Sequence, residues 1–314
     1  MRDRHGWEVD PAAIAATHGV VAGFALCVQA FTAPGDAVIL FTPVYHAFFR
    51  VLRANGRPIL ESPLVRRPEG RYAMDLDALA ASLTGAERMI VLCSPHNPGG
   101  RVWSRDELRA LADFAAAHDL LLVSDEIHHD LVLGPDAHVP MPLAAPDIAG
   151  RLVMLTAATK TFNLAGALTG NVIISDPTLR SRFTTAHLAA GTGANRFGML
   201  AVTAAYEGGA DWLDAVRRYL AGNAALLAEG VAAIPGVRPM PLDSTYLAWV
   251  DFAGTGMEPP EFTARVERDA RIAASHGRTF GTGGESFLRF NIATPRARVE
   301  EAVRRLQAAF ADLQ

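Results

Sequence analysis

A single lysine is the residue of this sequence whose type points most directly to chemistry. Lys160 is the only lysine of the chain, so 28 of the 29 Lys and Arg side chains are arginines. Arginine replaces lysine in most solvated roles, but a guanidinium stays protonated and so cannot attack an aldehyde to form an imine. A genome that favours arginine codons explains the missing lysines but not the retained one. Lys160 is therefore a candidate for amine chemistry.

Lys160 lies in TAATKTFNLAG, directly after the apolar run 151–156. This places it at the carboxyl end of a predicted strand, where open α/β sheets bind ligands. The hydroxyls of Thr156, Thr159 and Thr161 could donate to a phosphate there. Threonines near a strand end are as often plain strand formers or helix caps, so both interpretations of the three hydroxyls stay open.

A second polar segment, DEIHHD, begins at Asp125 directly after the apolar run 119–124. A carboxylate facing a pyridine nitrogen keeps that nitrogen protonated, and a pyridinium ring accepts the electrons of a carbanion. His128 could reach a phenolic oxygen on the same ring. Together with Lys160, Asp125 predicts chemistry on an aromatic aldehyde.

The same segment could instead ligate a metal, because it is rich in carboxylates and imidazoles. Its potential ligands are Asp125, Glu126, His128, His129 and Asp130. The segment lacks HExxH spacing and has no evident distant third ligand, so we expect no metal site. We expect His129 and Asp130 to be surface-facing residues of a loop or helix.

Three further residues could contact a flat, phosphorylated cofactor. Asn97, in the turn CSPHNPGG after the apolar run 88–93, could hydrogen-bond the ring oxygen. Tyr45, in FTPVYHAFF, could stack on the ring or could be a core or interface aromatic. Gly19 precedes an apolar helical run, so its turn could offer backbone amides to a phosphate.

Arg289 lies in the strand-like run FLRFNIA, between apolar neighbours. An arginine among hydrophobic residues is costly unless it is paired, and a substrate carboxylate would pair it through two hydrogen bonds. An exposed strand face or an internal salt bridge would also account for it.

Short apolar runs that alternate with helix-length segments predict an α/β fold with a mostly parallel sheet. Ser104 and Glu107 have capping-box spacing and predict one of the helix starts. Near residue 210 the pattern changes to a long helix (211–232), strand-like runs and a final helix from Arg296. We expect a large domain (1–210) and a smaller α+β domain (211–314). The predicted strands are 37–41, 88–93, 119–124, 151–156 and 171–175.

Composition excludes several classes of function. The net charge of -4 comes without any basic block, which argues against a nucleic-acid partner. No apolar run reaches the roughly 18 residues of a membrane helix, and the first residues do not resemble a signal peptide. Cys27 and Cys93 lie in apolar runs, which predicts buried free thiols and a cytoplasmic location.

Several segments together resemble the aminotransferase class I and II superfamily, fold type I of the enzymes that use pyridoxal 5′-phosphate (PLP). Within it they are similar to the MalY/PatB-like cystathionine β-lyase branch. The spacings from Asn97 to Asp125 (28 residues) and from Asp125 to Lys160 (35 residues) match the family's arrangement. The segments are PGDAVILFTPVYHAFF, CSPHNPGGRVW, VSDEIHHDL, TKTFNLAG, GGADWLDAVRRYLAGN and GGESFLRFNIATPR.

The resemblance implies a role for each candidate residue. Lys160 would form the imine and act as general base, and Asp125 would face the pyridine nitrogen. The remaining implied contacts are Asn97 and His128 at the ring oxygen, Tyr45 on the ring, Gly19, Val20 and Val21 at the phosphate, and Arg289 on the substrate carboxylate. The implied protein is a homodimer that eliminates a thiol from cystathionine or another cysteine conjugate, giving pyruvate and ammonia. An amino-acid aminotransferase is the alternative, and a PLP-binding regulatory protein or inactive paralogue is an alternative of another class.

Three departures from the family pattern carry further expectations. Leu168 stands where the superfamily often has a phosphate-binding arginine, and Thr159 stands where a serine usually precedes the lysine. The chain also begins inside the family's alignment, at RHGWEVD. We therefore expect it to lack a covering loop and a tyrosine donated to the partner's phosphate, and to hold PLP weakly.

Overall fold

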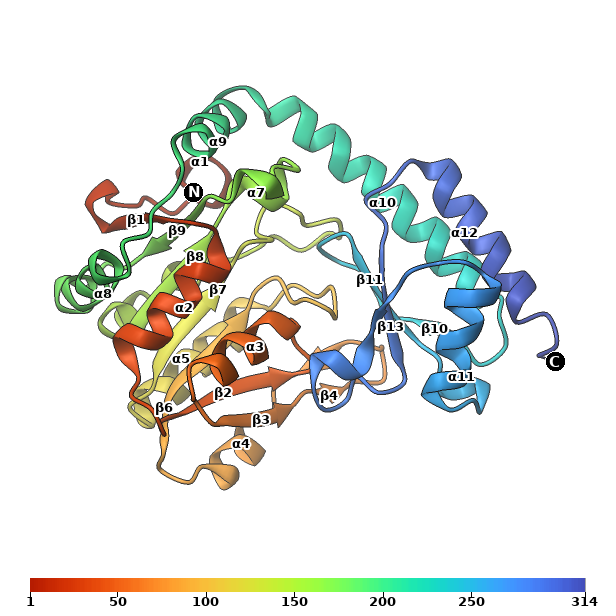
Figure 1. The fold of residues 1–314 in the computed structure, drawn as a ribbon, viewed down its shortest axis with the longest axis horizontal. Helices are drawn as coiled ribbons and strands as arrows, with labels where there is room; N and C mark the ends of the chain where they lie inside the picture. Colours follow the sequence, from red (N-terminus) through yellow and green to blue (C-terminus); the bar gives the residue numbers. More distant parts are fainter. Residues whose placement is uncertain (314) are drawn as a thin grey trace.

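A seven-stranded sheet forms the centre of the computed structural model, which describes residues 1–313. Its strand order is β1-β9-β8-β7-β6-β2-β3 (Figure 1). Neighbouring strands from β8 to β3 run parallel, as predicted, whereas β9 is antiparallel to both β8 and β1. The bounds are β1 Ile14–Thr17, β2 Ala37–Thr42, β3 Ile59–Pro63, β6 Glu87–Cys93, β7 Leu121–Asp125, β8 Leu152–Thr156 and β9 Gly170–Ile173.

The antiparallel edge follows from the connection between β8 and β9. That connection holds only α7 (Ala158–Thr161) and a short 3-10 turn, η3 (Ala165–Ala167). Parallel neighbours need a crossover, usually a full helix, to carry the chain back across the sheet. The short connection instead reverses the chain at the edge where Lys160 lies.

Helices cover both faces of the sheet because the side chains of its central strands alternate between two apolar layers. Ile39 and Ile90 face one layer, whereas Val38 and Met89 face the other. The first layer holds α4 (Leu76–Ser82), α5 (Arg105–Ala117) and α6 (Met141–Ala144). The second layer holds α2 (Val20–Phe31), α3 (His46–Ala54) and α8 (Pro177–Ala190).

A four-stranded antiparallel sheet forms the C-terminal part, with strand order β10-β11-β13-β12. Helices pack on it around a separate apolar cluster, and this part of the chain runs from turquoise to dark blue in Figure 1. The strands are β10 Arg238–Pro239, β11 Leu247–Asp251, β12 Ser275–His276 and β13 Phe287–Asn291, and the helices are α10 Ala210–Ala232, α11 Pro259–Ala264 and α12 Arg296–Ala309. Trp249 and Phe280 also pack into the core of the large sheet, so the two parts share a boundary.

Several local predictions are confirmed. The helix expected at 211–232 is α10, and the final helix begins at Arg296. The capping box is present: the Glu107 amide donates to Ser104 Oγ (3.2 Å), and the Ser104 amide donates to Glu107 Oε2 (2.9 Å). Both cysteines are buried and unpaired.

The remaining elements lie around the sheet. They are α1 (Arg2–His5), α9 (Arg196–Gly208) and the two-residue strands β4 (Val65–Arg66) and β5 (Tyr72–Ala73). None of the helices in residues 1–313 has the length and hydropathy needed to span a bilayer.

Candidate active site

A cavity of about 330 Å³ opens at the carboxyl edge of the large sheet, against β11 and β13 of the C-terminal part. The parallel strands β6 and β7 end there, and the helix α7 that follows β8 begins there. Ten of the predicted site residues line this cavity: Gly19, Val20, Val21, Tyr45, Asn97, Asp125, His128, Thr159, Lys160 and Arg289.

Asp125 is the last residue of β7 and is buried in the cavity wall. Burial raises the pKa of its carboxyl to about 7, and the neighbouring Glu126 carboxylate adds to the rise. The amide of Ile127 donates to Asp125 Oδ1 (3.1 Å) and opposes the shift. A carboxyl in this state gains from a positively charged partner, such as a protonated ring nitrogen.

Lys160 lies on α7 and is partly buried. Burial lowers the pKa of its ammonium, and the Arg289 guanidinium lowers it further, although Asp125 opposes both. A lowered pKa raises the fraction of neutral amine, which is the form that attacks a carbonyl or accepts a proton.

His128 is fully buried beside the cavity, and its ring meets that of Tyr246 edge to face at 6.0 Å between centroids. Burial lowers the pKa of His128 to about 3, and the charges of Lys160 and Arg289 add to the effect. Within residues 1–313 its Nδ1 has no hydrogen-bond partner. A buried polar atom of this kind is rare without a partner, so it indicates a ligand group at this wall.

The N-terminus of α2 forms another wall. Gly19 precedes this 12-residue helix with φ +84°, and no side chain caps the free amides of its first turn. The backbones of Gly170 and α2 approach closely: a Cβ on Gly170 would lie 2.7 Å from the Val20 nitrogen. The free amides and the helix dipole make this end of α2 suited to an anion.

Arg289, on β13, faces the cavity from the C-terminal part. It donates to Asn97 Oδ1 (2.8 Å) and Ser275 Oγ (3.2 Å), and its guanidinium lies 4.8 Å above the Phe280 ring. Burial lowers its pKa. No carboxylate among residues 1–313 forms an ion pair with it, so the internal salt bridge considered from the sequence is absent from the described chain.

Comparison with known proteins gives the same picture. The family model "Aminotransferase class I and II" matches residues 1–306. The chain belongs to this family. It is 38% identical over 316 residues to cystathionine beta-lyase PatB of Bacillus subtilis (strain 168), covering 98% of this chain and 80% of the relative. It is 34% identical to protein MalY of Escherichia coli (strain K12), covering 88% and 71% respectively.

Solved structures confirm the predicted fold, the type I fold of the PLP-dependent transferases. Cystalysin of Treponema denticola, whose structure contains a pyridoxal 5′-phosphate cofactor, superposes with a TM-score of 0.95 at 34% identity. That alignment covers all of this chain and 80% of cystalysin. The family resemblance expected from the sequence is thereby confirmed.

Tyr45 and Leu168 also line the cavity. Tyr45 meets His46 and Phe48 edge to face, at 4.9 and 5.7 Å between centroids. Burial raises the pKa of its phenol, and the Asp125 charge adds to this. Leu168 has a left-handed backbone (φ +45°) and is 45% exposed at the cavity, so no guanidinium occupies this position.

Two of the threonines do not reach the cavity. Thr156 is buried at the end of β8, opposite Asn171 of β9, and does not line the wall. Thr161 donates instead to Asp130 Oδ2 (3.1 Å). Thr159 is the only one of the three threonines at the cavity wall.

The expectation that His129 and Asp130 face the surface is wrong. Both side chains are 1% exposed. Asp130 is held by His129 Nε2 (3.2 Å), by His5 Nε2 (3.0 Å) and by the Thr161 hydroxyl, which together offset the cost of burying its charge.

Some wall residues were not predicted from the sequence. Asn291 lies two positions after Arg289 on β13, and strand alternation places both on one face, so this residue could have been found. His18 adjoins Gly19, whereas Tyr246 carries no local signal. The unpredicted residues are His18, Cys93, Ile127, Ala165, Leu168, Thr169, Tyr246, Leu247 and Asn291.

Proposed function

We propose that this protein is a PLP-dependent carbon–sulfur β-lyase. Its substrate would be cystathionine or a similar cysteine S-conjugate, and the products would be pyruvate, ammonia and a thiol. The observation that carries the proposal is that Lys160, Asp125 and Arg289 line one cavity, where no carboxylate of residues 1–313 pairs with Arg289. The choice of lyase over aminotransferase rests on relatives such as PatB, which is named a cystathionine beta-lyase.

The residues of the cavity suit PLP in charge and shape. The free amides of Val20 and Val21 and the hydroxyl of Thr159 would hold the phosphate. Asp125 would face the pyridine nitrogen, which would give the buried carboxyl the partner that its raised pKa calls for. Asn97 and His128 would contact the ring oxygen, and Tyr45 the ring face. When bound, PLP supplies an electron sink for the carbanion formed at the substrate Cα.

The protein's own groups then divide the work. Arg289 would hold the substrate carboxylate through paired hydrogen bonds, which fixes the position of Cα. The Lys160 amine, with its lowered pKa, would take the proton from Cα. The Cβ–S bond breaks with both electrons leaving on sulfur as a thiolate, and water hydrolyses the enamine that is left to pyruvate and ammonia. Asp125 would stabilise the positive charge on the protonated pyridine nitrogen.

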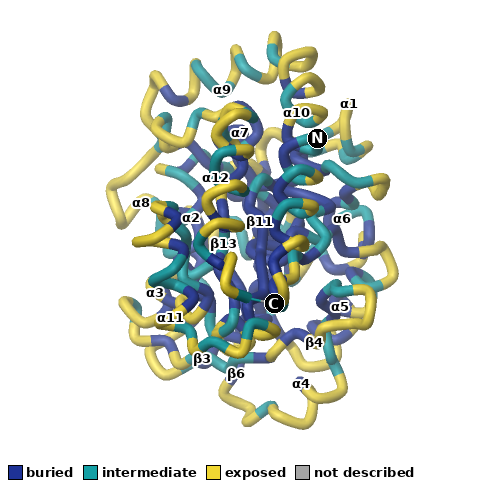
Figure 2. Tube along the Cα trace, turned by 90° about the vertical axis from the view of Figure 1, so that its right-hand side faces the viewer, coloured by how far each residue is buried: buried dark blue, intermediate teal, exposed yellow. Residues whose placement is uncertain are grey.

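We also propose a homodimer. Large apolar side chains of α8, α9 and the start of α10 are exposed, including Leu188 (76%) and Phe197 (86%), and Figure 2 shows these helices largely in yellow. Apolar patches of this kind mark contact surfaces. At Gly198, α9 packs against Thr169 of the cavity wall, so a partner on these helices would lie close to the site. Two unpaired buried thiols are compatible with a cytoplasmic location.

The domain organisation stays a proposal as well. We place the large PLP-binding domain at residues 1–210 and the small domain at 211–314. The long helix α10 begins at Ala210, and every residue of the C-terminal sheet and of its apolar cluster lies after that position.

Product analysis tests the lyase function. The full chain with PLP should release pyruvate and thiol from cystathionine in equal amounts over many turnovers, and Lys160→Arg should release neither. Formation of a keto acid that keeps the sulfur, with PLP converted to its amine form, would show an aminotransferase instead. Cofactor binding without any product would show a regulatory protein or inactive paralogue.

A further inference from the structure

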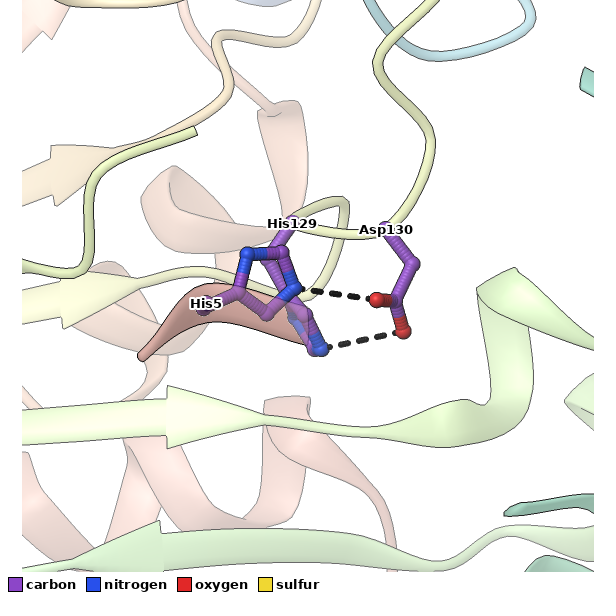
Figure 3. Close-up of side chains that lie close together, drawn as sticks. All are labelled: His5, His129 and Asp130. Carbon is purple, nitrogen blue, oxygen red and sulfur yellow. Dashed lines mark hydrogen bonds and ion pairs between the residues drawn. The ribbon is translucent and has the colours of Figure 1, made fainter. Parts of the chain in front are cut away.

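A buried cluster of two histidines and an aspartate lies behind the cavity, on the far side of the segment that carries Asp125. His5 Nε2 lies 3.0 Å from Asp130 Oδ1, and His129 Nε2 lies 3.2 Å from Asp130 Oδ2 (Figure 3). One ligand atom from each residue lies within 4.8 Å of the others. We propose that these three side chains bind a divalent transition metal ion of the zinc type, and this inference does not depend on the proposed β-lyase function.

The hydrogen bond on the other side of the His129 ring supports a cation. His129 Nδ1 lies 2.5 Å from the backbone carbonyl of Glu126. A carbonyl can only accept, so Nδ1 carries the proton, and in the neutral ring Nε2 is then a bare lone pair. That lone pair faces an oxygen of the Asp130 carboxylate. Two acceptors at this distance repel each other unless a positive charge stands between them.

The surroundings of the cluster match those of known metal sites. Ligating histidines usually donate their second ring N–H to a backbone carbonyl, as His129 does, and ligating carboxylates are hydrogen-bonded in turn. The hydroxyl of Thr161 donates to Asp130 Oδ2 (3.1 Å). Two imidazoles and one carboxylate suit zinc, cobalt or nickel, with water completing the coordination.

The neighbouring polar groups leave the three ligands free for an ion. His138, whose ring centroid is 5.5 Å from that of His5, uses its Nε2 on Glu126 Oε2 (2.7 Å) and so belongs to a separate pair. Arg4 lies 3.9 Å from Asp130 Oδ1, at the limit of an ion pair, and its side chain is 30% exposed. It can turn toward solvent when an ion binds.

The ion would join three distant parts of the chain. His5 ends α1, while His129 and Asp130 follow β7 in the loop that also carries Asp125 and His128. Through Thr161, Asp130 contacts α7, which carries Lys160. The structure therefore assigns the ion a tethering role, in which it holds the N-terminal segment against the helix of the candidate imine lysine.

The alternative is a proton on His129, which would make an imidazolium between the ring and Asp130 without any metal. The two accounts differ in one measurable property, because only the metal account requires stoichiometric binding that depends on both histidines. His5 contributes from a terminal segment 124 residues from His129, and an imidazolium at His129 needs no second imidazole.

The test is a titration of the untagged full chain, saturated with PLP and first dialysed against a chelator. Zn²⁺ alone should bind at one ion per chain with a Kd of about 1 µM or tighter. Co²⁺ in its place should give the visible absorption of a nitrogen- and oxygen-ligated ion. His129→Gln and His5→Gln should each weaken Zn²⁺ binding by about tenfold or more.

His276→Gln is the matched control, because His276 also pairs with a carboxylate (Glu267, 2.6 Å) but at the surface and without a third ligand. It should leave Zn²⁺ binding unchanged. If His129→Gln does not fold, His5→Gln decides, since its side chain lies in the terminal α1. Failure of the parent chain to bind Zn²⁺ in a one-to-one ratio, or equal affinity in the parent and His5→Gln, would overturn the proposal.

Discussion

Segment 125–130 contains an aspartate and a histidine facing the cavity, and a histidine and an aspartate facing away from it. On the cavity side, burial raises the pKa of Asp125 to about 7 and lowers the pKa of His128 to about 3. On the other side burial acts in the same direction, but pairing with Asp130 outweighs it and raises the pKa of His129. Burial alone would raise the pKa of Asp130, but its hydrogen bonds with His129 and His5 lower it instead.

The two pairs differ in the kind of partner that their surroundings call for. Both pairs are almost fully buried, so burial alone does not separate them. Asp130 lies between two imidazoles, His5 and His129, an arrangement that suits a shared cation, whereas Asp125 and His128 are held in states that a bound organic group would relieve. Buried polar groups that share one cavity and have no partner there indicate a ligand with polar groups of its own.

After the complete loss expected from Lys160→Arg, the largest effect on turnover is expected from Asp125→Asn. Loss of the carboxylate removes electrostatic stabilisation worth about 3 kcal/mol, so exchange of the substrate α-proton should slow by about a hundredfold or more. Proton exchange at Cα is measurable by NMR in deuterated buffer. An unchanged exchange rate would remove Asp125 from the chemistry.

The same variant should stabilise the cofactor-free protein. A folded-state pKa raised from 3.8 to about 7 means that the folded chain binds more protons than the unfolded chain between these values, so stability falls as pH rises through them. Asparagine does not ionise, so the variant does not lose this stability as pH rises. The gain in unfolding temperature of Asp125→Asn over the parent should be near zero at pH 4 and should grow up to pH 8.

A smaller loss is expected from Arg289→Gln. Removing the charge-assisted hydrogen bonds to the substrate carboxylate, worth about 1.5–3 kcal/mol, should lower kcat/KM by about 10–100-fold. PLP binding should change little, and its absorbance spectrum serves as the control. If amines without a carboxylate became no better relative to amino acids, Arg289 would not be the carboxylate site.

A gain of comparable or smaller size is expected from Leu168→Arg. A guanidinium at this cavity-facing position should add one charge-assisted contact to the phosphate and tighten PLP binding by about tenfold. Equilibrium dialysis of PLP against both chains measures the change, with Val65→Arg, at an exposed position outside the proposed dimer surface, as a control for added charge. Equal tightening in both variants would point to general electrostatics.

The smallest effect on turnover is expected from Asp130→Asn, on the side of the loop that faces away from the cavity. It should change kcat by less than about threefold but destabilise the fold by about 3 kcal/mol, because two imidazoles lose their charged partner. The pKa of Asp130 is lowered in the folded chain, so its contribution is present above the unfolded value near 4 and is lost as pH falls below it. Urea unfolding at pH 7 measures the loss of stability in the variant, and urea unfolding at pH 3 measures how much of that difference disappears in acid.

The sequence was sufficient to predict the residues at strand ends. Asp125, Asn97 and Lys160 follow apolar runs that become neighbouring parallel strands, so their convergence could be predicted from local pattern. Contacts between residues far apart in the sequence could not be predicted in this way. His5 and Asp130 are 125 residues apart, and nothing local to either indicates that α1 lies over the loop. For a related reason the sequence could not place the Thr156 side chain, since a strand-end hydroxyl can face the cavity or the core.

Lys160 is the amine that would carry the cofactor in the proposed mechanism. Treatment of the PLP-loaded chain with borohydride, followed by peptide mass spectrometry, tests this directly. The pyridoxyl group should be found on Lys160 at close to one per chain, and Lys160→Arg should carry none. A pyridoxyl group found on the Met1 amine instead, or equal labelling of the parent and the variant, would contradict this role of Lys160.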